Sequence, residues 1–216
     1  MKTGRYVALV LAASVPLVLG FAGSASAAGS NTGGAFGVQV TVLGQTIVPP
    51  TPIVNFPPGG QRGLLNVGQA GANAAGVQVS SNGDNNGNVA SSAGIIGASN
   101  TNGSTFAASG LTSSCTSSPS GSSGTTGVVN GSTAAGPVAN NPPPNTSIPL
   151  LIGTQTINEQ QQSPSGIRVR AVHSSTPVSD VILSESDCGV AIVGAANAAA
   201  ATATAAATAA MPSLAG

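Results

Sequence analysis

The sequence predicts an all-β fold, an antiparallel β-sandwich preceded by an N-terminal signal helix and followed by an Ala/Thr-rich C-terminal tail. Valine, isoleucine and threonine recur in short runs with apolar residues at alternate positions, the period of a half-buried strand. Thirty glycines and fifteen prolines, with many Asn and Ser residues, indicate tight turns rather than long helices. In the second half, these runs are spaced as the strands of an antiparallel meander, which favours a sandwich or barrel.

The segment from Met1 to Ala27 has the features of a secretory signal peptide. Two basic residues precede an uncharged apolar run over residues 6–23, and the run is followed by the small residues Ser-Ala-Ser-Ala. We expect cleavage after Ala27 or Ala28. An uncleaved membrane anchor is the alternative, which a proline and two glycines within the run disfavour. The mature protein is therefore expected to be secreted or associated with the cell envelope, with no membrane segment after cleavage.

The chain is expected to have three parts. The signal peptide (1–27) precedes one β-sandwich domain (28–194), which is long enough to bury a sizeable core. The tail (195–216) is almost entirely Ala and Thr, and it is either a frayed helix or disordered. It is a poor membrane anchor, because alanine contributes little to insertion and no Lys or Arg follows it.

Composition excludes several classes of function. Beyond residue 27 the chain has three arginines, five carboxylates and no lysine, a net charge of −2. Nucleic acids and anionic membranes require more basic contacts than three arginines supply, so neither is an expected partner. No small-molecule substrate is evident. The many β-branched residues favour a folded domain over a disordered linker.

The only two cysteines, Cys115 and Cys188, are expected to form a disulfide, because an even number in an exported protein favours pairing. Two buried free thiols are the alternative. The disulfide would close the long loop that runs from position 115 to position 188. For a loop of this length the chain-entropy model gives about 4 to 5 kcal/mol of stabilisation, less any native strain.

The first strand is expected at residues 36–42, where Phe36 and three valines alternate with smaller or polar residues. The prolines at 49, 50 and 52 are expected to interrupt strand pairing, and the Ser/Gly run at 117–126 is expected to be mobile. Further strands are expected at 53–56, 64–67, 76–80, 89–96, 105–109, 111–116, 128–129, 148–152, 155–160, 167–173, 178–184 and 190–193.

Several motifs occur in an order that is typical of one family. They are Cys-Thr-Ser-Ser from 115, Thr-Gly-Val-Val-Asn from 126, Pro-Pro-Pro-Asn-Thr-Ser-Ile-Pro from 142, Gly-Thr-Gln-Thr-Ile-Asn-Glu-Gln from 153, Gly-Ile-Arg-Val-Arg-Ala-Val-His from 166 and Asp-Val-Ile-Leu-Ser from 180, before the last cysteine. Over residues 35–193 the chain resembles the choice-of-anchor P family of exported actinobacterial proteins. The resemblance implies a secreted β-sandwich that is combined with different surface anchors, and it implies no known activity. The chain departs from this pattern by lacking an evident anchor, including the sortase signal Leu-Pro-x-Thr-Gly.

One segment matches the first half of a calcium loop, in which alternating side-chain oxygens converge on the ion. It runs Asn82-x-Asp84-x-Asn86-Gly87. The match fails at position 12, where Ala93 replaces the bidentate Glu. An Asn-Gly hairpin turn is therefore favoured over a calcium site.

His173, with a serine neighbour and Asp180 or Asp187, could be imagined as a hydrolytic triad, but no Gly-x-Ser-x-Gly turn supplies a nucleophile. Glu159 is expected to pair across strands with Arg168 or Arg170 rather than to act in a glycosidase carboxylate pair. We therefore expect no catalytic residues.

No cofactor or metal site is expected either, because one histidine and two paired cysteines do not make a zinc or haem ligand set. The leading hypothesis is a secreted or cell-surface, non-catalytic structural or interaction module, either part of the cell envelope or self-associating. One alternative is an extracellular hydrolase built on His173 or Glu159. Another is a surface protein that self-assembles through sheet edges, which low charge and Val-rich strands permit.

Overall fold

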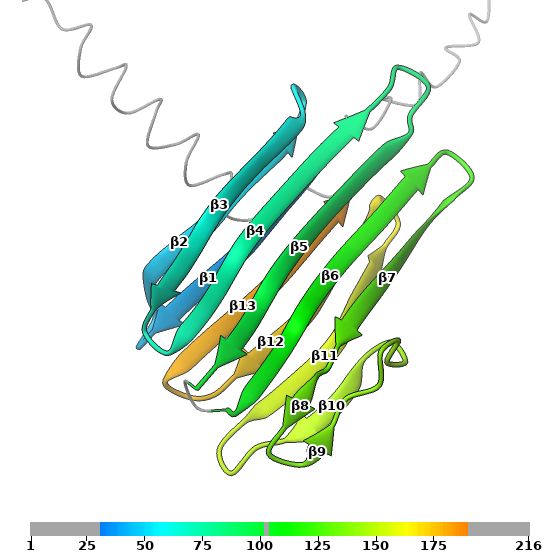
Figure 1. Ribbon diagram of the computed structural model, residues 1–216. Helices are drawn as coiled ribbons and strands as arrows, with labels where there is room; N and C mark the ends of the chain where they lie inside the picture. The colour runs from blue at the N-terminus through cyan, green and yellow to red at the C-terminus, as the bar shows by residue number, and fades with distance from the viewer. Residues whose placement is uncertain (1–30, 102–103, 190–216) are drawn as a thin grey trace, which may run out of the picture.

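The protein is an antiparallel β-sandwich, as predicted (Figure 1). A computed structural model describes residues 31–101 and 104–189, and these residues form two sheets packed face to face. The predicted signal peptide with its expected cleavage site at Ala27 or Ala28, the strand expected at 190–193 and the Ala/Thr tail lie outside the described residues. Among the described residues there is no helix that could cross a membrane.

The first sheet, sheet A, contains both the first and the last strand of the domain. Its order is β10-β11-β12-β13-β1-β2, so that β13 lies between β12 and β1. The strands are β1 (Gly33–Val42), β2 (Gln45–Phe56), β10 (Thr146–Pro149), β11 (Thr154–Ser163), β12 (Gly166–Ser175) and β13 (Ser179–Cys188).

The second sheet, sheet B, has the order β3-β4-β5-β6-β8-β9, and β7 also pairs with β6. Its consecutive strands from β3 to β7 form one antiparallel meander. Strands β10 to β13 form another in sheet A, in the second half of the chain, where the spacing predicted a meander. The strands are β3 (Gly60–Gln69), β4 (Ala72–Gly83), β5 (Val89–Asn100), β6 (Phe106–Ser118), β7 (Gly121–Val129), β8 (Ser132–Thr133) and β9 (Gly136–Pro137).

The core lies between the sheets and is aliphatic. Alternate residues of the strands point inward, so that burial of Val, Ile, Leu and Ala side chains stabilises the sandwich. The largest apolar side chains in this cluster are Phe106, Leu111, Ile157 and Leu183, all fully buried.

The prolines at 49, 50 and 52 interrupt the pairing of β2 with β1, as expected, but the strand itself continues through them. They lie within β2, which is the edge strand of sheet A. An edge strand has one side without ladder bonds, so it tolerates residues that lack an N–H group. The irregularity that the prolines do cause is a register shift, because Val38 pairs with Thr51 but Val40 pairs with Val48.

The Ser/Gly run at 117–126, which was predicted to be mobile, instead lies mostly in strands. It contributes the end of β6 and most of β7. Hydroxyl pairs join the two strands across the outer face of sheet B: Ser114 Oγ lies 2.9 Å from Thr125 Oγ1, and Thr116 Oγ1 lies 3.1 Å from Ser123 Oγ. Cross-strand Ser/Thr pairs stabilise a sheet without apolar periodicity. The strands expected separately at 105–109 and 111–116 are likewise one strand, β6.

One row of residues interrupts the regular pairing in four neighbouring strands of sheet A. The row consists of Asn158, Ala171, Ser184 and Gly37, and the residues on both sides of it are paired. Asn158 and Ser184 have positive φ angles of 54° and 61°. Ser184 faces the interior, where its Oγ lies 2.9 Å from the carbonyl oxygen of Ala93 in the opposite sheet. We call this row the register break.

Candidate functional site

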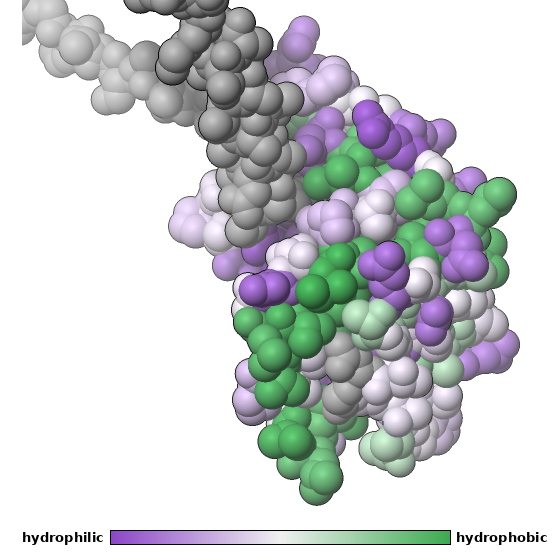
Figure 2. Space-filling view, turned by 90° about the vertical axis from the view of Figure 1, so that its left-hand side faces the viewer, coloured by the Kyte–Doolittle hydropathy of each residue, from purple (hydrophilic) through white to green (hydrophobic). Residues whose placement is uncertain are grey.

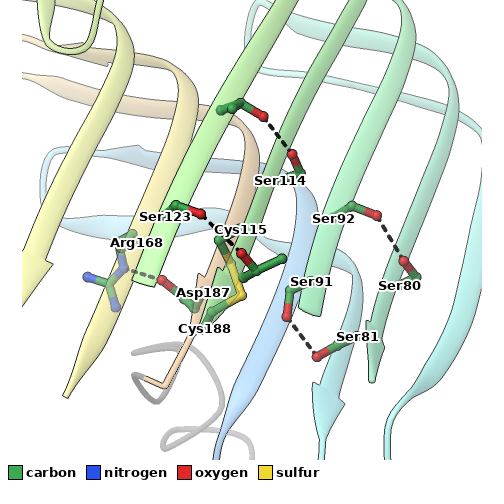
Figure 3. The surroundings of a disulfide bond; sticks show 12 residues. Ser80, Ser81, Ser91, Ser92, Ser114, Cys115, Ser123, Arg168, Asp187 and Cys188 are labelled. Carbon is green, nitrogen blue, oxygen red and sulfur yellow. Dashed lines mark hydrogen bonds and ion pairs between the residues drawn. A yellow bond between two sulfur atoms is a disulfide. The ribbon is translucent and has the colours of Figure 1, made fainter. Parts of the chain in front are cut away.

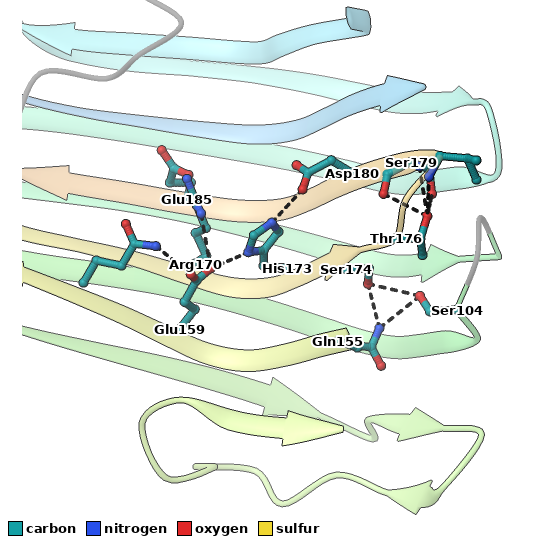
Figure 4. Close-up of polar contacts among 12 residues, drawn as sticks. Ser104, Gln155, Glu159, Arg170, His173, Ser174, Thr176, Ser179, Asp180 and Glu185 are labelled. Carbon is teal, nitrogen blue, oxygen red and sulfur yellow. Dashed lines mark hydrogen bonds and ion pairs between the residues drawn. The ribbon is translucent and has the colours of Figure 1, made fainter. Parts of the chain in front are cut away.

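Most of the charge of the domain lies on three adjacent strands of sheet A. Of the eight Asp, Glu and Arg residues beyond residue 27, only Arg62 and Asp84 are in sheet B or its turns. The other six and the single histidine lie on β11, β12 and β13: Glu159, Arg168, Arg170, His173, Asp180, Glu185 and Asp187. Figure 4 shows the part of this group around His173, and Figure 3 shows Arg168 with Asp187. We call these seven residues the charged network.

The register of the strands brings the central residues of the charged network together. Glu159, Arg170 and Glu185 are directly opposite one another on β11, β12 and β13. Arg168 is opposite Asp187 in the same way. Because directly opposed residues share one face of a sheet, carboxylates flank each arginine.

The register break brings His173 to the same face. In a regular strand, Arg170 and His173 would point to opposite faces because they are three residues apart. Between them, Ala171 and Val172 are both buried in the core, which shifts the alternation by one residue. His173 therefore lies beside Arg170 on the outer face, within reach of Glu159.

The charged network is a continuous chain of contacts between opposite charges. From one end, Asp180 Oδ2 lies 2.9 Å from His173 Nε2, and His173 Nδ1 lies 2.6 Å from Glu159 Oε2. The same Glu159 oxygen lies 3.3 Å from Arg170 Nη1. Gln161 donates a hydrogen bond of 2.6 Å to the other oxygen of Glu159.

The second half of the chain of contacts continues through the arginines. Arg170 Nε lies 2.6 Å from Glu185 Oε2, and Arg168 Nε lies 3.5 Å from Glu185 Oε1 and 2.8 Å from Asp187 Oδ1. The two ends of this path differ in exposure, since the side chain of Asp180 is 39% exposed and that of Asp187 is fully buried. The network therefore crosses three strands and ends beside Cys188.

His173 is held as a cation. Burial would lower the pKa of the imidazole, but hydrogen bonds to Asp180 and Glu159 and the charges of these carboxylates raise the pKa to about 9. Burial acts in the opposite sense on Glu159, but the hydrogen bond and charge of His173, together with Arg170, lower the pKa of this carboxyl to about 2. At neutral pH, His173 is therefore an imidazolium between two carboxylates.

Asp187 is the exception to this charge balance. Burial and the negative charge of Glu185 raise the pKa of Asp187 to about 8, against the opposing effect of Arg168. Its Oδ2 atom is buried without a hydrogen-bond partner among the described residues. A protonated Asp187 removes the repulsion between two carboxylates that share Arg168.

The geometry brings together only some of the residues considered for catalysis. His173 contacts Asp180 and Glu159 but not Asp187, and each of its ring nitrogens faces a carboxylate rather than a serine. A triad histidine has one nitrogen directed at the nucleophile and acts as a base from its neutral form. Glu159 has its predicted cross-strand partner in Arg170, whereas Arg168 contacts Asp187 and Glu185 instead.

The calcium-like segment forms the turn between β4 and β5. Asp84 Oδ1 accepts hydrogen bonds from the backbone N–H groups of Asn86 (2.8 Å) and Asn88 (3.0 Å), and Oδ2 accepts one from the Asn88 side chain (2.8 Å). These bonds are typical of an Asx turn. Ala93 is buried in the core, and no group of three or more metal-binding side chains occurs among residues 31–101 and 104–189.

The predicted disulfide is present and joins the two sheets (Figure 3). Cys115 on β6 and Cys188 on β13 have Cα atoms 5.9 Å apart. Both are buried and pack with Val89, Ile167 and Val169. A covalent link between the sheets is expected in an oxidising compartment and gives an extracellular location modest support.

Sequence reasoning missed Glu185 and Asp187 as network members. The sequence did contain a signal for them. Glu185 and Asp187 are two residues apart, like Arg168 and Arg170 on the preceding strand, and this spacing allows the two pairs to face each other across the strands. The position of His173 had no comparable signal, since it depends on the register break.

No protein-family model, curated protein or solved structure matches this chain. Function must therefore be inferred from the geometry above. The charged network holds three strands together. Both ring nitrogens of His173 and the carboxylates of Glu159 and Asp180 already have partners within the protein.

Proposed function

We propose that this protein is a non-catalytic structural or interaction module that acts outside the cytoplasm, secreted or associated with the cell envelope. The observation that carries the proposal is the placement of His173 between Glu159 and Asp180, with both ring nitrogens engaged. The ionisable side chains that would be the candidates for catalysis in this domain are thus engaged in holding strands together. The charged network and the inter-sheet disulfide then keep the domain folded outside the cell.

The alternative is an extracellular hydrolase that uses His173 or Glu159. Such an enzyme needs a base that is neutral at working pH, whereas the pKa of His173 is raised to about 9. Sugar stacking would also require exposed aromatic rings, but Phe36 and Phe106 are buried, and Phe56 is partly buried against the residues around the disulfide. Loss of an activity in His173→Gln, with the fold intact, would favour the hydrolase instead.

Export is the second part of the proposal. The segment from Met1 to Ala27 has the charge and hydropathy pattern of a signal peptide, and a buried disulfide suits an oxidising compartment. The order of motifs over residues 35–193 supports membership of the choice-of-anchor P family. A module of this kind is retained at the surface by a separate element or partner, or is released.

The experiment that tests the proposal is fractionation of the native host into cytoplasm, membrane, wall and medium, with intact mass measured on the recovered protein. We expect a chain that begins at Ala28 or Gly29 and is lighter by two hydrogens at Cys115 and Cys188. Recovery from the wall or membrane would identify a retained module, and recovery from the medium a released one. A full-length, fully reduced chain in the cytoplasm would overturn the proposal.

A further inference from the structure

The sheets have edges at β2 and β10 in sheet A, and at β3, β7 and β9 in sheet B. An edge strand exposes backbone N–H and C=O groups that another strand can pair with, and proteins usually block such edges. In this domain the edges differ in how they are blocked.

The edges of sheet A are protected by proline and by length. Strand β2 contains three prolines, which cannot donate to a new ladder. Strand β10 has four residues and ends at Pro149. Neither strand offers a long row of free backbone groups.

Side chains and loop groups occupy the β7 edge of sheet B. Gln160 Nε2 donates to the carbonyl oxygen of Gly124 (3.0 Å), and Gln162 Nε2 donates to that of Ser122 (3.2 Å). The backbone N–H of Val128 donates to the carbonyl oxygen of Asn140 (2.8 Å). Strand β9 is only two residues long and includes a proline.

Strand β3 has none of these protections. It is ten residues long, has no proline or lysine, and within the described part of the chain it is paired only with β4. Its middle residues, Leu64 and Leu65, are 41% and 92% exposed. Figure 2, which views the molecule from the side of β2 and β3, shows apolar side chains exposed among polar ones. A long, unblocked edge with exposed leucines at its middle is typical of a strand-pairing site.

We propose that β3 pairs with β3 of a second copy of this chain, antiparallel and about a two-fold axis, so that the two B sheets form one continuous sheet. The pattern of β3 is suited to its own copy. Leu64 and Leu65 are the fifth and sixth of its ten residues. The two-fold axis of an antiparallel strand pair passes through two identical residues, so an axis at Leu65, next to the middle of the strand, places Leu65 of one copy opposite Leu65 of the other.

Charge also permits pairing with a second copy. Arg62 is the only charged residue on β3, and it lies to one side of the midpoint. Antiparallel pairing therefore places the two arginines on opposite sides of the axis rather than facing each other. The net charge of −2 beyond residue 27 adds little long-range repulsion between copies.

The proposed pairing produces a closed dimer and not a fibre. Each copy contributes one open edge, and the two-fold arrangement uses both. The other edges remain blocked by proline, short length or side-chain hydrogen bonds, so no further copy can add. The dimer does not depend on whether the charged network is catalytic.

The test is the molar mass of the oxidised protein, expressed from the full sequence and measured by light scattering and sedimentation at up to roughly 100 µM, enough to populate a pair with a Kd near 10 µM. We expect a dimer for the wild type. Leu65→Lys places two like charges at the axis and is expected to give a monomer. The matched control is Ile96→Lys, which changes another exposed apolar residue, 70% exposed on the outer face of β5, and is expected to remain a dimer.

A second variant keeps the proposal falsifiable if the lysine substitution impairs folding. Leu65→Cys is expected to form a covalent dimer on mild oxidation, whereas Ile96→Cys is not. A monomeric wild type, a dimeric Leu65→Lys, assembly beyond the dimer, or efficient crosslinking through position 96 would each overturn the pairing through β3.

Discussion

Arg170 and His173 are three residues apart on β12, yet both contact the same oxygen, Oε2 of Glu159. Two consecutive inward residues, Ala171 and Val172, make this possible. The register break is thus what turns separate cross-strand ion pairs into one network. Its consequences for stability can be tested one residue at a time.

The histidine should make stability depend on pH. The pKa of His173 is raised from 6.5 to about 9 in the folded protein, so its stabilising effect is fully present below pH 6.5 and is lost as pH rises through 9. We expect His173→Gln to remove a decrease on the order of 1 to 3 kcal/mol over this interval. Urea unfolding from pH 6 to pH 10, with the disulfide intact, measures it. An unchanged profile in the variant would show that His173 is not held as a cation.

Asp187 should also lower stability as pH rises, but over a lower pH range. Its folded pKa of about 8 exceeds the ordinary value of 3.8, so the folded state binds the proton more tightly and stability falls between these values. Asp187→Asn keeps the shape and should flatten that fall. Asp84→Asn is the matched control, because Asp84 lies in the turn between β4 and β5, outside the charged network, and its pKa is lowered by hydrogen bonds from Asn88 and Asn86, so its effect is lost only as pH falls. If the free energy of unfolding of Asp187→Asn depended on pH as strongly as that of the wild type, this prediction would be contradicted.

Gly37 should be intolerant of a side chain. A Cβ atom there would lie 2.2 Å from Cγ1 of Val77 in the opposite sheet. We expect Gly37→Ala to cost about 1 to 3 kcal/mol through overpacking, and Val77→Ala to recover part of this loss when the two are combined. Gly94→Ala, where the nearest atom is 3.8 Å away, is the control and should be nearly neutral. The free energy of unfolding of Gly37→Ala, Val77→Ala, the double variant and Gly94→Ala, measured with denaturant, tests this. Losses of stability that simply add in the double variant would count against the contact.

The disulfide should contribute much of the stability. Replacing both Cys115 and Cys188 by alanine removes the link between β6 and β13. The chain-entropy model for a loop of this size gives a loss of about 4 to 5 kcal/mol. Denaturant unfolding of the double variant and of the wild type provides the comparison. A loss below about 1 kcal/mol would mean that packing between the sheets, and not the crosslink, holds them together.

The fold class and the disulfide could be predicted because both follow from local patterns: alternating valines, turn residues, and two cysteines in a chain that begins with a predicted signal peptide. The cross-strand pair of Glu159 with Arg170 was predictable for the same reason. The position of His173 was not, because a strict period of two places it on the opposite face from Arg170. The positive φ angles of Asn158 and Ser184, which accompany the break, depend on contacts with distant groups such as the carbonyl of Ala93.

The failure at residues 117–126 has a different cause. Apolar periodicity identifies strands that bury one face, but β7 is held to β6 by Ser and Thr pairs on the outer face. The prolines of β2 interrupt pairing as predicted, but the sequence did not predict one continuous strand across them, because the effect of a proline depends on whether its strand lies at an edge. Neither property can be determined from a short window of sequence.

The most direct test of the closed network is the titration of His173 by NMR. It is the only histidine in the chain, so its imidazole signals need no assignment among several. The account predicts a pKa near 9 and protons on both ring nitrogens at pH 7, with Glu159→Gln lowering the pKa. A pKa at or below the ordinary 6.5, with one ring nitrogen free, would contradict the account and return His173 to the candidates for a catalytic base.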